Sequence, residues 1–155
     1  MDNKRKEIIW PPETITRKNY LWWHTYSTRW GDNDFYGHIN NRIYNSIFDT
    51  VVNYFLIKKA GFDPLNSDFI GVTPEIRCRY FKSISYPEIV DVGIIIKRLG
   101  NSSVQYEIGI FKIGEDDPCA VGYFVHVYVD RNEQKKVVNI PKNIYSACKL
   151  ITEKS

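Results

Sequence analysis

The sequence has few cysteines, no long apolar run and no apolar leader. Its three cysteines, Cys78, Cys119 and Cys148, are odd in number and lack C-x-x-C spacing, so neither a disulfide framework nor a zinc knuckle is predicted. No stretch approaches the roughly 18 consecutive apolar residues of a membrane-spanning helix, and the N-terminus lacks the apolar core of a signal peptide. We therefore expect a soluble, cytoplasmic protein with reduced thiols and no membrane partner.

Strong charge and several catalytic motifs are also missing. The formal net charge is +3, and basic residues are scattered among acidic ones, so nucleic-acid binding is not predicted. The three histidines, His24, His38 and His126, are too dispersed to indicate a zinc site. There is no G-x-S-x-G elbow, no P-loop and no dinucleotide glycine pattern. We expect neither a metal nor a cofactor.

What is present is the composition of one folded domain. The chain has 155 residues, of which 43% are hydrophobic and 15% aromatic, and this argues against disorder. Residues 1–18 have mixed charge and contain the Pro11-Pro12 break, which predicts an extended N-terminal arm. A single domain is expected over residues 19–152.

The spacing of apolar residues predicts an α+β fold. Alternation after Asn19 indicates a first strand, and helical spacing from about Asn41 to Gly61 indicates one long helix. Four more alternating segments predict strands at 76–81, 90–97, 104–110 and 121–129. A short terminal helix is expected after Pro141. Successive strands with hairpin-length links favour an antiparallel sheet.

The segment from Trp30 to Tyr44, WGDNDFYGHINNRIY, points to chemistry. It places Asp32 and Asp34 on a short loop just before the helix that Asn40 and Asn41 can cap. The first N–H groups of a helix have no intrahelical acceptor, and the helix dipole there favours an anion or a developing oxyanion. The alternative is that the two aspartates only shape the turn through bonds to the backbone.

This segment resembles the signature of the 4-hydroxybenzoyl-CoA thioesterase-like family of the hotdog superfamily. The family pattern is D-x-D-x-x-G, often followed by H-[VI]-N-N and then a tyrosine, and the similarity continues more weakly through FKSISYPEIVDV, LGNSS and AVGYFVHVYVD. The resemblance implies the hotdog fold, an antiparallel sheet of about five strands wrapped around one long central helix. It also implies a homodimer or homotetramer with the acyl site between subunits.

The resemblance assigns catalytic roles residue by residue. Asp34 matches the carboxylate that attacks the thioester carbonyl carbon or activates a water, and Asn41 matches the backbone N–H donor to the carbonyl oxygen. His38 is a supporting group. Asp49, two turns further along the helix, is the rival acid, because another hotdog branch places its catalytic carboxylate on this helix.

Four further positions are predicted to lie at the substrate. Asn40 is expected to organise the loop, and Tyr44 matches the family tyrosine, more as a packing residue than as a catalyst. Ser102 and Ser103, at the predicted Gly100-Asn101 hairpin turn, match a small-residue turn of the family that could meet the ligand.

The implied function is hydrolysis of an acyl-CoA thioester to a free acid and CoA. One alternative is an acyl-carrier-protein thioesterase or a hotdog hydratase, although the hydratase pattern D-x-N-P is not matched here because no proline follows Asn33 and Asp34. The other alternative is a non-catalytic acyl-CoA-binding protein. Replacing Asp34 by Asn separates an enzyme from a binder, since only an enzyme loses rate.

Overall fold

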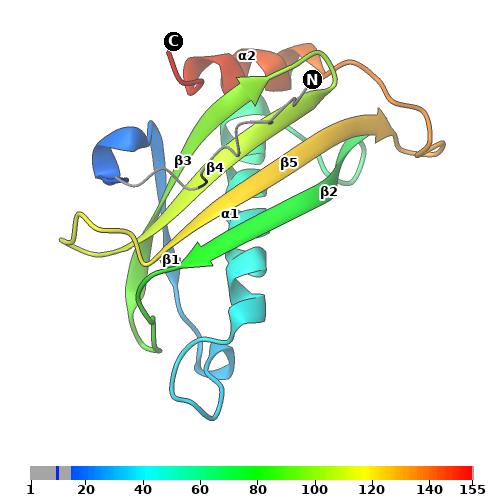
Figure 1. Cartoon of the computed structure of the whole chain (residues 1–155). Coiled ribbons are helices and arrows are strands. Elements are labelled where there is room, and N and C mark those ends of the chain that lie inside the picture. The colour runs from blue at the N-terminus through cyan, green and yellow to red at the C-terminus, as the bar shows by residue number, and fades with distance from the viewer. Residues whose placement is uncertain (1–9, 11–14, 155) are drawn as a thin grey trace, which may run out of the picture.

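The computed structural model describes residue 10 and residues 15–154, so most of the predicted arm at 1–18 lies outside the described residues. The described residues form five strands and two α-helices, whose arrangement can be followed in Figure 1. They are β1 (Trp22–Ser27), α1 (Asn41–Ala60), β2 (Phe69–Tyr80), β3 (Ile89–Leu99), β4 (Ser103–Lys112), β5 (Ala120–Asp130) and α2 (Lys142–Leu150). Short 3-10 turns at Arg17–Asn19 and Trp30–Asp32 precede and follow β1.

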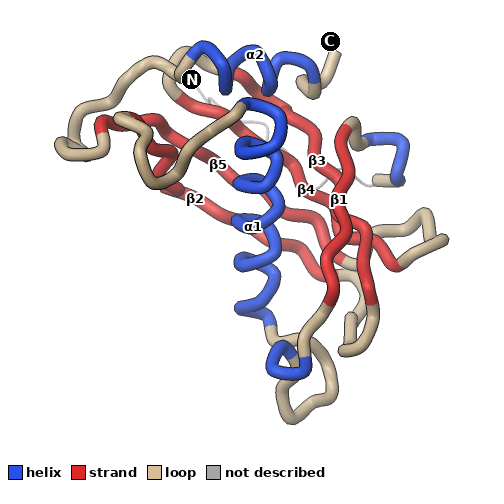
Figure 2. Tube along the Cα trace, turned by 180° about the vertical axis from the view of Figure 1, so that it is seen from behind, coloured by secondary structure: helices blue, strands red, loops and turns tan. Residues whose placement is uncertain are grey.

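The strands form one antiparallel sheet in the order β1-β3-β4-β5-β2. The long helix α1 crosses one face of this sheet, as Figure 2 shows from behind. The predicted α+β architecture, five antiparallel strands around one long helix, is therefore confirmed. Because β1 and β2 each pair on one side within this sheet, they form its two edges.

The start of β2 was predicted wrongly. The sequence indicated a strand at 76–81, whereas β2 begins at Phe69. The pairing of β2 with β5 shifts register between Val72 and Glu75, around Pro74, and a bulge of this kind interrupts the alternation of side chains that defines a strand in a sequence. Only the residues after the bulge keep the alternation of side chains from which a strand can be predicted.

Helix α1 begins and ends where its capping residues predict. Asn40 precedes it, and the Asn40 side chain accepts a hydrogen bond from the Arg42 N–H. Gly61 follows it with φ of 65°, and the Gly61 N–H donates to the Leu56 carbonyl. Across the part of the chain that the structure describes, no helix combines the length and apolarity needed to span a bilayer.

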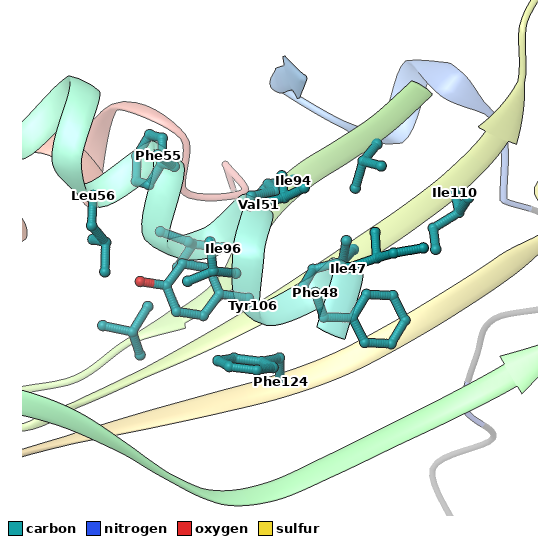
Figure 3. Close-up of a cluster of buried hydrophobic side chains, with 14 of the residues drawn as sticks. Ile47, Phe48, Val51, Phe55, Leu56, Ile94, Ile96, Tyr106, Ile110 and Phe124 are labelled. Carbon is teal, nitrogen blue, oxygen red and sulfur yellow. The ribbon is translucent and has the colours of Figure 1, made fainter. Parts of the chain in front are cut away.

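The core lies between α1 and the inner face of the sheet. Ile47, Phe48 and Val51 of α1 are fully buried and pack over residues of β3, β4 and β5, as Figure 3 shows. Gly122 of β5 makes this approach possible, because a Cβ built there would lie 2.5 Å from Phe48 Cζ. The helix is thus held tightly against the sheet, and its first turn has a defined position.

The other face of the sheet carries a second, smaller apolar cluster. Its buried members are Ile15, Tyr20, Ile95, Phe111 and Val121, with Trp10 and Trp23 packed against them. Arg17 is anchored over this face by Asp91 Oδ2 at 2.8 Å and by the Lys112 carbonyl oxygen at 2.8 Å. The described part of the predicted arm therefore contacts the sheet, while the domain boundary at 18/19 stays a prediction.

Candidate functional site

The loop between β1 and α1 folds back on itself at its tip. The Asp34 N–H donates to the His38 carbonyl at 2.9 Å, and the Gly37 N–H donates to the Asp34 carbonyl at 3.1 Å. Gly37 has φ of 80°, a conformation that glycine adopts without steric cost. The glycine of the D-x-D-x-x-G pattern thus turns the chain so that it can enter α1.

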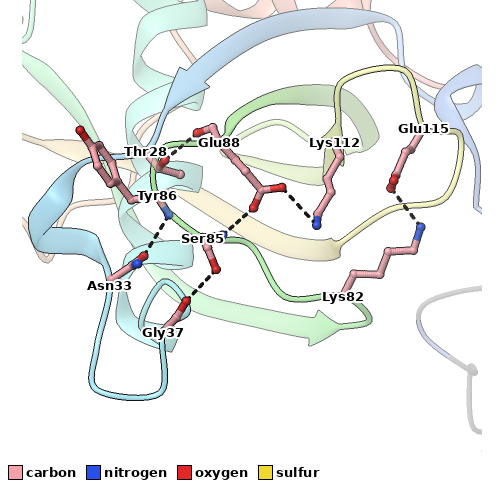
Figure 4. Close-up of polar contacts among 9 residues, drawn as sticks. All are labelled: Thr28, Asn33, Gly37, Lys82, Ser85, Tyr86, Glu88, Lys112 and Glu115. Carbon is pink, nitrogen blue, oxygen red and sulfur yellow. Dashed lines mark hydrogen bonds and ion pairs between the residues drawn. The ribbon is translucent and has the colours of Figure 1, made fainter.

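A distant segment, between β2 and β3, fixes the position of this loop. Figure 4 shows Ser85 Oγ donating to the Gly37 carbonyl at 2.7 Å and the Tyr86 N–H donating to Asn33 Oδ1 at 3.0 Å. Sequence reasoning did not identify Ser85 or Asn33, because these bonds join residues 48 and 53 positions apart. The only early signal was the weak family similarity of FKSISYPEIVDV.

The two aspartates of the motif have different surroundings. Asp32 is fully buried, and its carboxylate accepts from the Arg29 N–H at 2.8 Å and pairs with the Arg29 guanidinium at 3.2 Å. The Asp32 carbonyl also accepts from the Asn40 N–H at 2.8 Å. Asp32 therefore holds the loop together and has no access to a substrate.

Asp34 is half-buried and lines an open cavity of about 500 Å³ together with Trp30, Asn33 and Phe35. Its Oδ1 accepts from the Tyr36 N–H at 2.9 Å. Its Oδ2 accepts from Asn40 Nδ2 at 3.1 Å. Two N–H donors thus orient the carboxylate in a cavity that a ligand can enter.

The first N–H of α1 is open to a ligand. Asn40 occupies the next two amides, since its Oδ1 accepts from the Arg42 N–H and its carbonyl accepts from the Ile43 N–H. Among the residues that the structure describes, none accepts from the Asn41 N–H. Such an amide at a helix start is a donor to an anionic oxygen. The Asn41 position therefore has the free donor that an oxyanion needs.

Asn41 lines a second cavity, of about 220 Å³, and His38 lines it too. The other lining residues are Ile39, Tyr44, Tyr80, Phe81, Lys82 and Ser83. Asp34 lines the first cavity and Asn41 lines the second. Asn40 links the two residues, because its side chain donates to the Asp34 carboxylate and it directly precedes Asn41 in the sequence. The His38 side chain is exposed and bonds to no described residue, so it is free to contact a ligand.

Tyr44 is buried beside this second cavity. Its ring packs edge-on against Tyr80 with centroids 4.8 Å apart. Burial, more than the nearby thiols, raises the pKa of the Tyr44 hydroxyl well above its usual range. The hydroxyl is therefore neutral at working pH, so Tyr44 can pack and donate but cannot serve as a base.

Besides Asn40, which lines neither cavity itself, three of the predicted residues lie outside both cavities. Asp49 is exposed on α1, where its Oδ1 accepts from Asn53 Nδ2 at 3.1 Å. Ser102 and Ser103 lie at the β3–β4 hairpin, where the Tyr128 N–H donates to the Ser102 carbonyl at 2.8 Å. In Figure 1 this hairpin is at the opposite end of the sheet from the loop that carries Asp34. One chain does not bring these three residues to the loop.

Cys78 and Cys148 are poor candidates for a catalytic nucleophile. Burial raises the pKa of the Cys78 thiol and of the Cys148 thiol to about 11, so both are protonated near neutral pH and are poor nucleophiles. Within residue 10 and residues 15–154, no three His, Cys, Asp or Glu side chains are grouped as metal ligands.

Known proteins resemble this chain over most of its length. A family model described as "Thioesterase-like superfamily" matches residues 28–148. The solved structure of the PA5185 protein from Pseudomonas aeruginosa is 40% identical, with a TM-score of 0.88 over 91% of this chain and 98% of that one. The PA2801 protein from Pseudomonas aeruginosa is 27% identical, with a TM-score of 0.75 over 83% and 98%.

A third solved structure shows the fold alone. It is a gentisyl-coenzyme A thioesterase, 20% identical to this chain, with a TM-score of 0.72 over 82% of this chain and 99% of that one. Among curated proteins no match was found.

Proposed function

Because this chain belongs to the thioesterase-like superfamily, we propose that it hydrolyses an acyl-CoA thioester to a carboxylic acid and free CoA. The observation that carries the proposal is the link from Asp34 through Asn40 to the start of α1. One short, anchored loop thus carries an oriented carboxylate and a backbone N–H that donates to no residue the structure describes. These two groups suit thioester hydrolysis, because the thioester carbonyl is electrophilic and thiolate is a good leaving group, so that neither a strong general acid nor a metal is essential.

In the proposed reaction Asp34 acts on the carbonyl carbon. Either its carboxylate removes a proton from a water that attacks the carbon, or the carboxylate attacks the carbon directly. In the second case loss of the CoA thiolate leaves a mixed anhydride, which a water then cleaves. The tetrahedral oxyanion is stabilised by the Asn41 N–H and the positive end of the helix dipole. The C–S bond then breaks, and CoA leaves as a thiolate that takes up a proton. His38, exposed beside Asn41, is proposed as a supporting donor.

A homodimer or homotetramer is part of the proposal. Strand β2 is a long edge of 12 residues, with Phe69 and Tyr80 partly exposed, and such an edge is a template for pairing with a second chain. Ser102 and Ser103 lie far from Asp34 in one chain, so their predicted contact with the ligand requires a second subunit. Sedimentation velocity on the full chain tests the assembly.

The substrate is proposed to be a CoA thioester. The gentisyl-coenzyme A thioesterase of the same fold acts on a thioester of this kind. The test is a panel of acyl-CoA, acyl-carrier-protein and 2-enoyl-CoA substrates, with thiol release and enoyl hydration measured in parallel. Preferential turnover of carrier-bound substrates or hydration of the enoyl group would replace the acyl-CoA assignment.

Substitution of the carboxylates tests the mechanism. Asp34→Asn keeps the acceptor for the Tyr36 N–H but removes the charge, so we expect hydrolysis to fall about 100-fold or more with ligand affinity retained. Asp116→Asn, on the exposed β4–β5 turn, is the matched control. Asp49→Asn tests the rival acid: a larger loss there than at Asp34 reassigns the catalytic role.

A further inference from the structure

A third cavity, of about 170 Å³, lies at the other end of α1 from the loop that carries Asp34. Figure 2 shows α2 beside this end of α1 and the loop at the opposite end. The cavity is lined by Trp22, Phe55, Lys59, Ala147, Leu150 and Ile151. Phe55 lies almost four turns after Asn41, which is about 20 Å along the helix. This cavity is therefore separate from the candidate catalytic site.

The inner walls of this cavity belong to the folded core. Phe55, Ala147 and Ile151 are buried, and each is part of the main apolar cluster. The Trp22 ring packs against Phe55, with centroids 5.2 Å apart and an interplanar angle of 64°. The cavity is thus formed before a ligand arrives, which reduces the entropy lost on binding. An apolar cavity of about 150 Å³ is large enough to hold benzene, so this one has room for a small hydrocarbon group.

The rim of the cavity carries a positive charge. Lys59 lines it, and no ion pair between described residues involves Lys59. The C-terminus of α1 brings only about half a negative charge. Part of that charge is already compensated, because the Ala60 carbonyl accepts from Asn143 Nδ2 at 2.8 Å and the Leu56 carbonyl accepts from two N–H groups beyond the helix. The full charge of the lysine therefore outweighs the helix dipole and favours an anion.

The rim also has an apolar side. Leu150 is 83% exposed, although Ala147 and Ile151 beside it are buried. A hydrocarbon group that enters the cavity covers part of the Leu150 side chain and removes apolar surface from water. An apolar interior with one charged group at its mouth suits an amphipathic anion, whose hydrocarbon part lies inside and whose charge stays at the rim.

The number of lysines at the mouth distinguishes between anions. Lys58 does not line the cavity, and its ammonium lies 5.8 Å from the centre of the Tyr54 ring. One lysine, Lys59, is thus left to pair with a ligand. It neutralises a carboxylate, whereas a phosphate monoester carries nearly two negative charges at pH 7 and would keep one of them unpaired.

We propose that this cavity binds a small apolar carboxylate. The hydrocarbon part lies between Trp22, Phe55 and Ile151, and the carboxylate accepts from the Lys59 ammonium. The inference uses no residue of the candidate catalytic site, so it does not rest on the proposed thioesterase function. Lys59 selects the charge of the ligand, and the buried walls limit its size.

The first experiment measures which charge the cavity selects. Hexanoate, hexan-1-ol and hexylammonium are titrated into the full-length protein in its native oligomeric state, and binding is followed by two-dimensional NMR of the amide groups and of the Trp22 indole N–H. We expect hexanoate to bind about tenfold more tightly than hexylammonium, with hexan-1-ol between them. The largest shifts should lie at the end of α1 and in α2. Equal affinities, or shifts confined to the loop that carries Asp34, overturn the inference.

The second experiment compares variants of the rim and of the wall. Lys59→Gln should weaken hexanoate binding about threefold to fivefold and leave hexan-1-ol binding unchanged. Lys58→Gln is the matched control and should change neither affinity. Ala147→Leu fills the cavity and should abolish binding of both compounds, whereas Lys59→Gln, at an exposed position, leaves the core intact. Equal losses of hexanoate affinity in the two lysine variants show diffuse attraction and overturn the inference.

The third experiment tests the other occupant of this surface, a second copy of the chain. Sedimentation of Leu150→Ser is compared with that of Leu65→Ser, since both leucines are 83% exposed. We expect neither variant to change the mass of the assembly. If Leu150→Ser alone dissociates the oligomer, the rim is a subunit interface and the inference is wrong. None of these measurements depends on hydrolysis, so failure of the proposed function is a separate result.

Discussion

Asn40 donates from its Nδ2 to Asp34 Oδ2 at 3.1 Å, and this hydrogen bond joins the candidate catalytic carboxylate to the cap of α1. The same side chain accepts from the Arg42 N–H at 3.1 Å through its Oδ1. The side-chain amide of Asn40 therefore both orients the Asp34 carboxylate and caps the N-terminus of α1. Any change at Asn40 should alter both stability and catalysis.

The first prediction concerns Asn40→Ala. Loss of the cap should lower the free energy of unfolding by about 1 kcal/mol. Loss of the bond to Asp34 should lower the hydrolysis rate roughly tenfold or more, because the carboxylate is no longer oriented. Urea denaturation and thiol release measure the two effects, with Thr50→Ala on the exposed face of α1 as control. Full activity in Asn40→Ala would show that the bond does not matter for catalysis.

The second prediction separates the two aspartates of the motif. Asp32→Ala leaves the Arg29 N–H and the Tyr26 hydroxyl without their carboxylate acceptor, so unfolding should become easier by about 2 kcal/mol. The exposed Asp116→Ala should change stability by less than about 0.5 kcal/mol. Asp34→Asn should lose rate with little change in stability. If Asp32→Ala is as stable as the wild type, the Asp32 carboxylate does not hold the loop together.

The third prediction tests the contact between α1 and the sheet. In Gly122→Ala the new Cβ would lie 2.5 Å from Phe48 Cζ, and Phe48 is fully buried. Overpacking of this kind should cost about 1–3 kcal/mol of unfolding free energy. Gly31→Ala is the control, since a Cβ there meets nothing within 4 Å. In the double variant Gly122→Ala with Phe48→Leu, part of the unfolding free energy lost in Gly122→Ala should be recovered. If the effects of the two substitutions on unfolding free energy are strictly additive, Gly122 and Phe48 are not in contact.

The fourth prediction is a pH dependence of stability. Burial among Tyr106, Phe124 and Tyr128 lowers the pKa of the His126 imidazole from 6.5 to about 4. Above pH 6.5 both folded and unfolded forms are neutral at this residue. Between pH 6.5 and 4 only the unfolded chain takes up the proton, so stability should fall as the pH falls.

The size of this loss of stability follows from the difference between the His126 pKa in the folded and the unfolded chain. Between pH 7 and pH 4.5 His126 should account for about 2–3 kcal/mol of lost unfolding free energy. Denaturation at both pH values measures it. His126→Phe should lose correspondingly less over the same interval, whereas Thr50→Ala, on the exposed face of α1, should behave like the wild type. Equal losses in His126→Phe and the wild type would contradict the assignment.

The local elements could be predicted because their signals are local. Asn40 and Gly61 marked the two ends of α1, and apolar periodicity identified the sheet strands and the order that favours an antiparallel fold. Both signals depend on residues within a few positions of one another. The start of β2 was missed because a bulge near Pro74 breaks the period.

The chemistry of the loop was only partly determined by the sequence. The D-x-D motif, the cap and the family resemblance singled out Asp34, Asn41 and His38, and their catalytic roles stay predictions. Which aspartate is buried depends on Arg29 and on the packing of the whole loop. No spacing rule distinguishes two aspartates that lie two residues apart.

The sequence by itself thus determined the elements, their order and the segment that carries the chemistry, because caps and periodicity act over a few residues. Only the tertiary structure decided that Asp32 is buried while Asp34 lines a cavity. It also decided that Ser85 and Tyr86 hold the loop in position and that Ser102 lies at the far end of the sheet. These facts depend on contacts between segments tens of residues apart, which form only when the whole chain has folded.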